Sequence, residues 1–437
     1  MEYQEKPRKD TEENMADSPD TTAQGRENTA GENSGEGFSF MQETIKNENS
    51  GSGKSRNTVL KYAGLGLIFG LAACLGFYAL KPWAENHFAG NPQKVTIPEE
   101  EEEQVQEGEA QQQEEEVPEL TLEDYEKMNQ ALVTVANDVN RSMVEISVRT
   151  QTPGEEDTSI AGVIFEDNGT ELLVAGQSFS VPEGGTLQAV LADNNTYNIR
   201  MKKQDTNLGI AVYAIQKSEI PDSAWNQIRT AVLGSSGGMT KGTVVLAVGS
   251  PFGYYGGMGF GVVSSSRNVA SRYDGEYGLL CTDIGSSGKG SGILANTKGE
   301  IVGLIHQDLM DEEEAGPVTA YGISDLKEAL ELLSNDQTVP YIGIHGVTVT
   351  EDLTNSQGIP SGVYVREVGP DSPAMTAGIQ SGDVLTDING TKITTLSGYN
   401  SALMKLGEGQ EIRVKGQRQG TGGYVEISFK VTVGGKD

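Results

Sequence analysis

A loop rich in glycine and serine is the stretch of this chain best suited to covalent chemistry. Residues 282–303 read T-D-I-G-S-S-G-K-G-S-G-I-L-A-N-T-K-G-E-I-V-G and follow the apolar run from Tyr277 to Cys281. The pattern predicts a strand, a tight loop and then a β-hairpin. Backbone N–H groups of such a loop can stabilise an oxyanion, and a serine within it, such as Ser291, can attack a carbonyl carbon.

Histidine, the usual base for a serine nucleophile, is scarce in this sequence. The chain has three histidines, His87, His306 and His345. A serine hydroxyl needs a base that takes its proton during attack, and no histidine lies between His87 and His306 to supply one upstream of the loop. Lys289 could act as the base in a Ser–Lys arrangement, although a tight surface loop favours an ordinary solvated lysine.

The composition limits the partners and cofactors. The formal net charge of −31 over 437 residues argues against a nucleic-acid partner, which requires clustered lysine and arginine. The glutamate runs at 99–103 and 114–116 are typical of a solvated linker. The two cysteines, Cys74 and Cys281, belong to no metal-spaced cluster, and a disulfide between them is not expected. We therefore expect no metal and no cofactor.

The first 118 residues predict a tail, a membrane helix and a linker. Residues 1–57 are polar and predict a disordered cytoplasmic tail. Residues 58–81 predict a transmembrane helix, because Tyr62 to Leu80 carries no charge and, at ~1.5 Å per residue, nearly spans a bilayer core. Residues 82–118 form an acidic linker. Lysine and arginine precede the helix more often than they follow it. The positive-inside rule therefore predicts a single-pass protein of the cell membrane, with its C-terminal domains extracytoplasmic.

Residues 119–336 predict a mainly β domain. Thr121 and Asp124 have the spacing of a capping box, and apolar residues recur at helical intervals as far as Val139. From Met143 onward short alternating strands replace this pattern, which predicts a sandwich or barrel, and a helix over 324–333 closes the domain. The predicted strands cover 144–150, 162–166, 171–175, 186–191, 196–202, 210–215, 244–248, 259–264, 278–283, 292–295 and 301–306.

Residues 339–434 resemble a PDZ domain. The stretch S-P-A-M-T-A-G-I-Q-S-G-D-V-L-T-D-I-N-G from Ser372 to Gly390 carries the glycines, the aspartate and the apolar positions of the PDZ pattern. The resemblance implies that backbone N–H groups of a Y-I-G-I loop bind a terminal carboxylate, while the strand over 345–349 and a helix over 396–406 flank the peptide. Core packing is the alternative for each of these residues. The implied peptide-binding residues are Tyr341, Ile342, Gly343, Ile344 and Leu403.

The domain before it is similar to the protease domain of the HtrA/DegP family of serine proteases. The resemblance covers roughly residues 133–333 and rests on V-V-L-A-V-G-S-P-F-G from Val244, G-V-V-S-S-S-R from Gly261 and T-D-I from Thr282. It implies a chymotrypsin-like double β-barrel followed by an α+β PDZ domain, with a single transmembrane helix in front.

The three catalytic positions of that family do not match in this sequence. The family histidine corresponds to Gln177 in L-L-V-A-G-Q-S-F, the aspartate to Gly209 in G-I-A-V, and the serine to Gly290 in G-K-G-S-G-I-L-A-N. Ser291 would be the nucleophile only if the correspondence slid by one residue. By the same resemblance the oxyanion loop comprises Gly288, Lys289 and Gly290.

These patterns favour a membrane-anchored HtrA-like pseudoprotease. It would bind C-terminal or extended peptides and unfolded proteins through its PDZ groove and a degenerate substrate cleft, in envelope protein quality control or signalling. An active HtrA-type serine endopeptidase with an atypical catalytic constellation is the first alternative, and an architectural protein whose domains mediate oligomerisation is the second. The family resemblance also implies a homotrimer.

Overall fold

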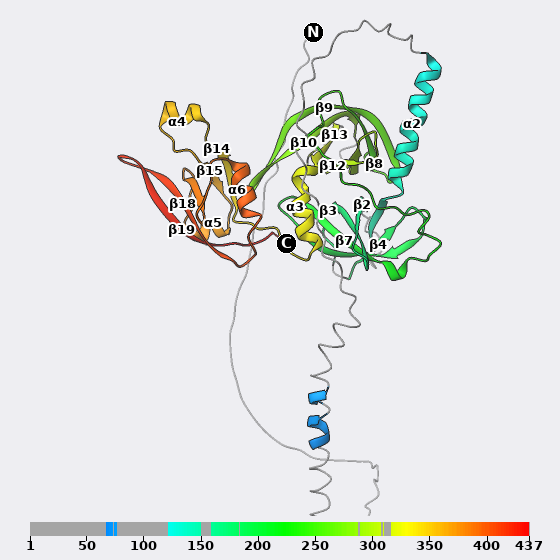
Figure 1. Cartoon of the computed structure of the whole chain (residues 1–437), viewed down its shortest axis with the longest axis horizontal. Helices are drawn as coiled ribbons and strands as arrows, with labels where there is room; N and C mark the ends of the chain where they lie inside the picture. Colours follow the sequence, from blue (N-terminus) through cyan, green and yellow to red (C-terminus); the bar gives the residue numbers. More distant parts are fainter. Residues whose placement is uncertain are drawn as a thin grey trace, which may run out of the picture. The chain divides into compact units, whose positions relative to one another are not determined.

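The computed structural model describes residues 67–72, 74–76, 121–149, 159–182, 184–286, 289–306, 309 and 316–436 (Figure 1). By its contacts the chain divides into two units, 1–79 and 80–437. The described residues of the first unit are helical. Within the described ranges, no helix is both long and apolar enough to cross a membrane. Most of the predicted membrane helix over 58–81 lies outside these ranges, as do the predicted tail and linker.

Seven antiparallel strands form a sheet in the order β5-β4-β1-β2-β3-β7-β6, which corresponds to the first barrel of the predicted fold and is called the first barrel below. The order begins with β5 and ends with β6, and Ile199 alone joins these two strands, so the two edges of the sheet meet at that residue. The single strand predicted over 196–202 is therefore wrong, because the chain turns a corner there. The strands are β1 (Met143–Arg149), β2 (Ser159–Asp167), β3 (Glu171–Gln177), β4 (Thr186–Val190), β5 (Thr196–Asn198), β6 (Arg200–Asp205) and β7 (Ile210–Gln216), followed by the short helix η1 (Lys217–Glu219).

The second barrel is closed, in the order β10-β13-β12-β11-β8-β9. The sequence pattern did not predict β13, and it predicted β9 and β10 shorter than they are. The outer half of β9, from Ser264 to Arg272, is mostly exposed and polar, so it shows no apolar alternation. The strands are β8 (Val244–Ser250), β9 (Gly257–Arg272), β10 (Gly275–Gly285), β11 (Ser291–Ala295), β12 (Ile301–Ile305) and β13 (Pro317–Gly322).

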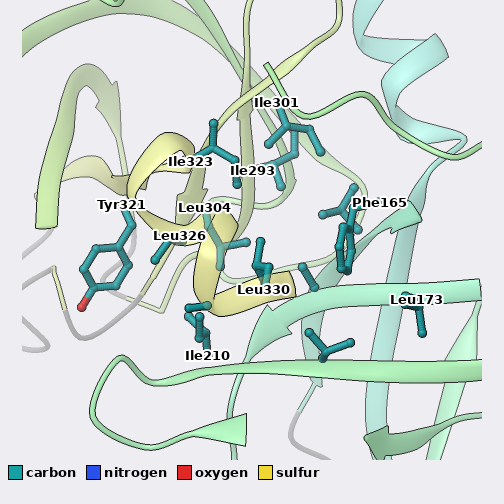
Figure 2. Close-up of a cluster of buried hydrophobic side chains, with 14 of the residues drawn as sticks. Phe165, Leu173, Ile210, Ile293, Ile301, Leu304, Tyr321, Ile323, Leu326 and Leu330 are labelled. Atoms are coloured by element: carbon teal, nitrogen blue, oxygen red, sulfur yellow. The ribbon is translucent and has the colours of Figure 1, made fainter. Parts of the chain in front are cut away.

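One apolar core joins the two barrels and the helix α3 (Ile323–Ser334). Figure 2 shows Leu326 and Leu330 of α3 directed toward strands that also contribute Ile210 and Leu304. This shared core fixes the ends of β3, β7 and β11 close to one another, which matters for the site described below.

The helix α2 (Leu122–Asn140) begins as the sequence predicts and packs only in its second half. Both hydrogen bonds of the Thr121–Asp124 capping box are present. Ala136 and Val139 are buried in the shared core, whereas Leu122 and Tyr125 are 75% and 61% exposed. Among the described residues, the apolar face of α2 is therefore covered at its C-terminal end and exposed in its first turns.

The PDZ domain is a six-stranded sheet in the order β14-β15-β16-β18-β19, with β17 paired to β16. β14 lies at an edge of this sheet, as a strand that accepts a peptide must. The helix predicted over 396–406 ends at Leu403. The elements are β14 (Ile344–Thr348), α4 (Glu351–Gln357), β15 (Val363–Val368), α5 (Pro373–Ala377), β16 (Val384–Ile388), β17 (Thr391–Lys392), α6 (Leu396–Leu403), β18 (Glu411–Gly420) and β19 (Gly423–Thr432).

The close antiparallel pairing of β11 with β8 generates a prediction about stability. Gly292 has a φ of +120°, and a Cβ there would lie 2.3 Å from the carbonyl oxygen of Val248. We expect Gly292→Ala to lower the free energy of unfolding by about 3 kcal/mol, through backbone strain and this clash. Gly285→Ala is the matched control, because a Cβ there meets nothing within 4 Å, and it should change stability by less than ~0.5 kcal/mol. Urea unfolding of both variants measures this, and equal losses would contradict the proposed clash.

Candidate functional site

Gln177, at the end of β3, links the two barrels. Its side chain is 2% exposed, and its Nε2 donates hydrogen bonds to the carbonyl oxygens of Gly290 at 3.1 Å and Ile305 at 3.2 Å. The Tyr213 hydroxyl donates to the backbone carbonyl of Gln177 at 2.6 Å, and burial raises the pKa of that phenol. Gln177 and Gly290, which the sequence predicts at the positions of the family histidine and serine, are thus joined by a hydrogen bond.

Gly209 lies in the turn before β7, with a φ of +72°. Its carbonyl accepts hydrogen bonds from the Ser178 N–H at 2.8 Å and from His306 Nε2 at 2.7 Å. A carbonyl oxygen can only accept, so Nε2 of His306 carries the hydrogen of this bond. Asp205, four residues before Gly209, accepts at Oδ1 from the Leu208 N–H at 2.7 Å and caps the turn.

Ser291 lies on β11, where its side chain is directed at the first barrel. Its Oγ accepts a hydrogen bond from the Ala161 N–H at 2.9 Å, and the residue is 2% exposed. Lys289 is exposed and Gly290 is buried, while Gly288 lies outside the described residues. The hydroxyl of Ser291 is therefore engaged in barrel–barrel contact and is shielded from solvent.

The Y-I-G-I loop of the PDZ domain binds a carboxylate, and that carboxylate belongs to this chain. The backbone N–H groups of Ile342 and Gly343 donate to Oδ2 of Asp274 at 2.8 and 2.7 Å, and that of Ile344 donates to Oδ1 at 3.1 Å. The Tyr399 hydroxyl donates to Oδ1 at 2.6 Å. Burial raises the pKa of the Asp274 carboxyl, and the donated hydrogen bonds oppose that rise. The loop therefore has the anion-binding geometry that its sequence predicts.

The remaining predicted groove residues are buried. Leu403 is fully buried in the PDZ core and Tyr341 is 4% exposed, with its ring 5.9 Å from that of Tyr273. The burial of Leu403 agrees with the alternative of core packing, and its role beside a peptide stays a prediction. The α6 residues that contact the Asp274 turn are Tyr399 and Asn400, which sequence reasoning missed.

Asp274 was also missed, although the sequence held a signal for it. Asp274 and Gly275 form an Asp-Gly pair, which indicates a tight hairpin turn. In the structure the turn residues are Tyr273 and Asp274, and Gly275 is the first residue of β10, where it pairs with Arg272. That signal would have located the β9–β10 turn. It would not have shown which loop the turn contacts.

The position of Gln177 generates a second prediction. Gln177→Glu places a carboxylate against the carbonyl oxygens of Gly290 and Ile305, where an amide donor now lies. We expect the free energy of unfolding to fall by about 2–4 kcal/mol at pH 7. The carboxylate has no hydrogen to donate to the two carbonyl oxygens, and its charge is buried without a partner. Gln188→Glu on β4 is the control, since that side chain is only partly buried. Urea unfolding at pH 7 measures both, and an unchanged Gln177→Glu variant would contradict the bridging role.

Comparison with known proteins agrees with these two domains. The PDZ domain family matches residues 340–429. The Serine protease Do-like HtrA of Bacillus subtilis (strain 168) is 26% identical over 313 residues, which cover 66% of this chain and 68% of that protein. The protein of the same name from Lactobacillus helveticus is 22% identical over 292 residues, covering 63% and 68%.

A solved structure shows the same fold. The HtrA-type protease AlgW, in a structure with a decapeptide, matches with a TM-score of 0.50 and 19% identity, over 69% of this chain and 99% of that one. Together with the strand order and the PDZ match, these findings confirm the resemblance drawn from the sequence. The chain is HtrA-like: it joins a trypsin-like, mainly β fold to a C-terminal PDZ domain and is related to serine proteases of the HtrA/DegP family.

Proposed function

We propose that this chain is a non-catalytic, membrane-anchored HtrA-like protein that binds peptides and unfolded proteins outside the cytoplasm. One observation carries the non-catalytic part. The residues at the three catalytic positions, Gln177, Gly209 and Gly290, make hydrogen bonds that join the two barrels.

The chemistry of hydrolysis supports this proposal. Acyl transfer needs a nucleophile and a base within hydrogen-bond reach of it. The Ser291 Oγ is buried and accepts from the Ala161 N–H, and His306 Nε2 donates to Gly209. An attack by Ser291 would have to break its contact with the first barrel and expose the hydroxyl to a substrate.

Peptide binding is supported by the PDZ domain. Its loop presents three backbone N–H groups to a carboxylate, and β14 lies at the edge of the sheet. An added strand can pair with such an edge. The related AlgW structure contains a decapeptide. The degenerate cleft beside Lys289 and Gly290 is the second surface that we propose for peptides, and a homotrimer and a role in envelope quality control or signalling belong to the same proposal.

Membrane anchoring is supported by the helical residues of the first unit. Leu67, Ile68 and Phe69 are 66%, 68% and 77% exposed, and Leu75 is 70% exposed. Large apolar side chains exposed along a helix are stabilised by hydrocarbon rather than by water.

The non-catalytic proposal predicts that the full-length protein in detergent micelles is not labelled by a fluorophosphonate probe and does not cleave casein. Both signals should equal those of the Ser291→Ala variant, since the Ser291 hydroxyl is buried and its Oγ accepts from the Ala161 N–H. Trypsin serves as the positive control. Labelling or cleavage that disappears with Ser291→Ala would instead establish the alternative of an active endopeptidase.

The anchoring proposal predicts that the full chain stays in the membrane pellet during alkaline carbonate extraction. Replacing Phe69 and Leu71 together by arginine should move the protein to the soluble fraction, because each charge at a helix centre disfavours insertion by about 3 kcal/mol. The matched control replaces Leu122 and Tyr125 by arginine, since these residues are equally exposed on α2. Soluble wild-type protein would refute the anchor.

A further inference from the structure

The tip of the β9–β10 hairpin lies in the groove that the PDZ resemblance assigns to peptides. We propose that Asp274 is an internal ligand of the PDZ carboxylate loop, so that an external C-terminal carboxylate binds only by displacing it. This inference rests on the proposed peptide-binding function and adds to it the regulation of that site.

The Asp274 carboxylate accepts hydrogen bonds from all three N–H groups of the loop and from the Tyr399 hydroxyl. Oδ2 accepts two hydrogen bonds, from the N–H groups of Ile342 and Gly343, and Oδ1 accepts two, from the Ile344 N–H and the Tyr399 hydroxyl. A carboxylate has about four acceptor sites, so this one is saturated. Asp274 is also 3% exposed. A peptide's terminal carboxylate carries the same two oxygens, and the loop cannot hold both carboxylates at once.

The backbone of the turn also occupies the peptide's place. The N–H of Asp274 donates to the carbonyl of Ile344 at 2.7 Å, a main-chain bond at the start of the edge strand β14. On the other side, Nδ2 of Asn400 on α6 donates to the carbonyl of Asp274 at 3.1 Å. The turn therefore bridges the strand and the helix that an added peptide strand would contact.

The rest of the hairpin holds the turn in position. Tyr273 lies with its ring 4.1 Å from that of His345. Asn207, in the first barrel, donates from Nδ2 to the Tyr273 carbonyl at 3.0 Å and accepts from its N–H at 3.1 Å. A ligand tethered in this way acts at an effective concentration of millimolar or more, and the apparent affinity for an external ligand falls by the fraction of molecules with the groove open.

The contact is open on one side. A pocket of about 310 Å³ lies beside it, lined by Ser271 and Tyr273 of the hairpin and by His345 of β14, among others. An incoming chain can therefore approach the edge strand next to the turn.

The conformation of Asp274 decides which variants test the proposal. Its φ is +63°, in the left-handed region where glycine is unstrained and asparagine is tolerated. Asp274→Gly therefore removes the carboxylate without backbone strain, and Asp274→Asn removes the charge while keeping the shape. Glu276→Gln is the matched control, because it removes a charge from an exposed position two residues away in the same hairpin.

The experiment measures peptide binding and amide exchange on the full chain in detergent micelles. Decapeptides with apolar C-terminal residues, each made as the free acid and as the amide, are titrated by fluorescence anisotropy. We expect free acids to bind Asp274→Gly at least ~10-fold more tightly than wild type, with Asp274→Asn between them, Glu276→Gln unchanged and amides not bound. Hydrogen exchange without peptide should be at least ~10-fold faster over 341–345 in Asp274→Gly only, with β18 as the internal reference.

The outcomes separate this inference from the proposed function. Equal affinity of wild type and Asp274→Gly for free acids, with unchanged exchange over 341–345, overturns the internal ligand and leaves peptide binding in place. Absence of binding to every variant, with faster local exchange in Asp274→Gly, overturns peptide binding and supports the internal ligand. Exchange that rises equally in β18 shows general loosening and overturns the inference.

Discussion

The two barrels share one apolar core, and several polar groups at its border have their hydrogen-bond partners in the opposite barrel. A buried polar group without a hydrogen bond is costly, so side chains at this junction reach the backbone of the opposite barrel. Gln177 of the first barrel donates to Gly290 and Ile305 of the second, and Ser291 and His306 of the second bond Ala161 and Gly209 of the first. The hydrogen bonds that hold the two barrels in position are therefore the same bonds that occupy the side chains of Gln177, Ser291 and His306.

This constraint bears on chemistry. A catalytic group must be able to exchange its proton with a substrate, whereas a structural group must keep its partner. The side chains at this junction have backbone partners at 2.7–3.2 Å, and Gln177, Ser291 and His306 are each 2% exposed. A site with these properties suits a scaffold, which is the basis of the proposed non-catalytic function.

The second consequence of the barrel fold is the reach of its longest hairpin. β9 has 16 residues and β10 has 11, and their turn delivers Asp274 to the PDZ domain. A further contact ties the C-terminal end of the chain to the first barrel, since the Thr206 N–H donates to the Lys436 carbonyl at 2.7 Å. The carboxylate that the PDZ loop binds in this structure is thus the side chain of Asp274 from the same chain.

Local patterns predicted much of the fold. Capping residues, apolar alternation and tight glycine turns act over a few residues, so Thr121 fixed the start of α2, and most strand positions were predicted to within two residues. The S-P-A-M-T-A-G stretch encodes α5 in the same way, with Ser372 as its N-cap and Gly378 as its left-handed C-cap. The N–H groups of Ile342 to Ile344 were predicted as a carboxylate site through the resemblance to a PDZ domain, and the three N–H groups do donate to one carboxylate.

What the sequence determined by itself, then, was most of the strands, the division into two domains, the residue types at Gln177, Gly209 and Gly290 and, through the PDZ resemblance, the carboxylate loop. Only the tertiary structure decided which groups those residues meet. Ser291 bonds a residue 130 positions away, Gln177 one 113 positions away, and Ile342 a carboxylate 68 positions away. Periodicity and propensity act over a few neighbouring residues, whereas these contacts form only when whole barrels and domains pack. The local sequence around each residue therefore does not specify its distant partner.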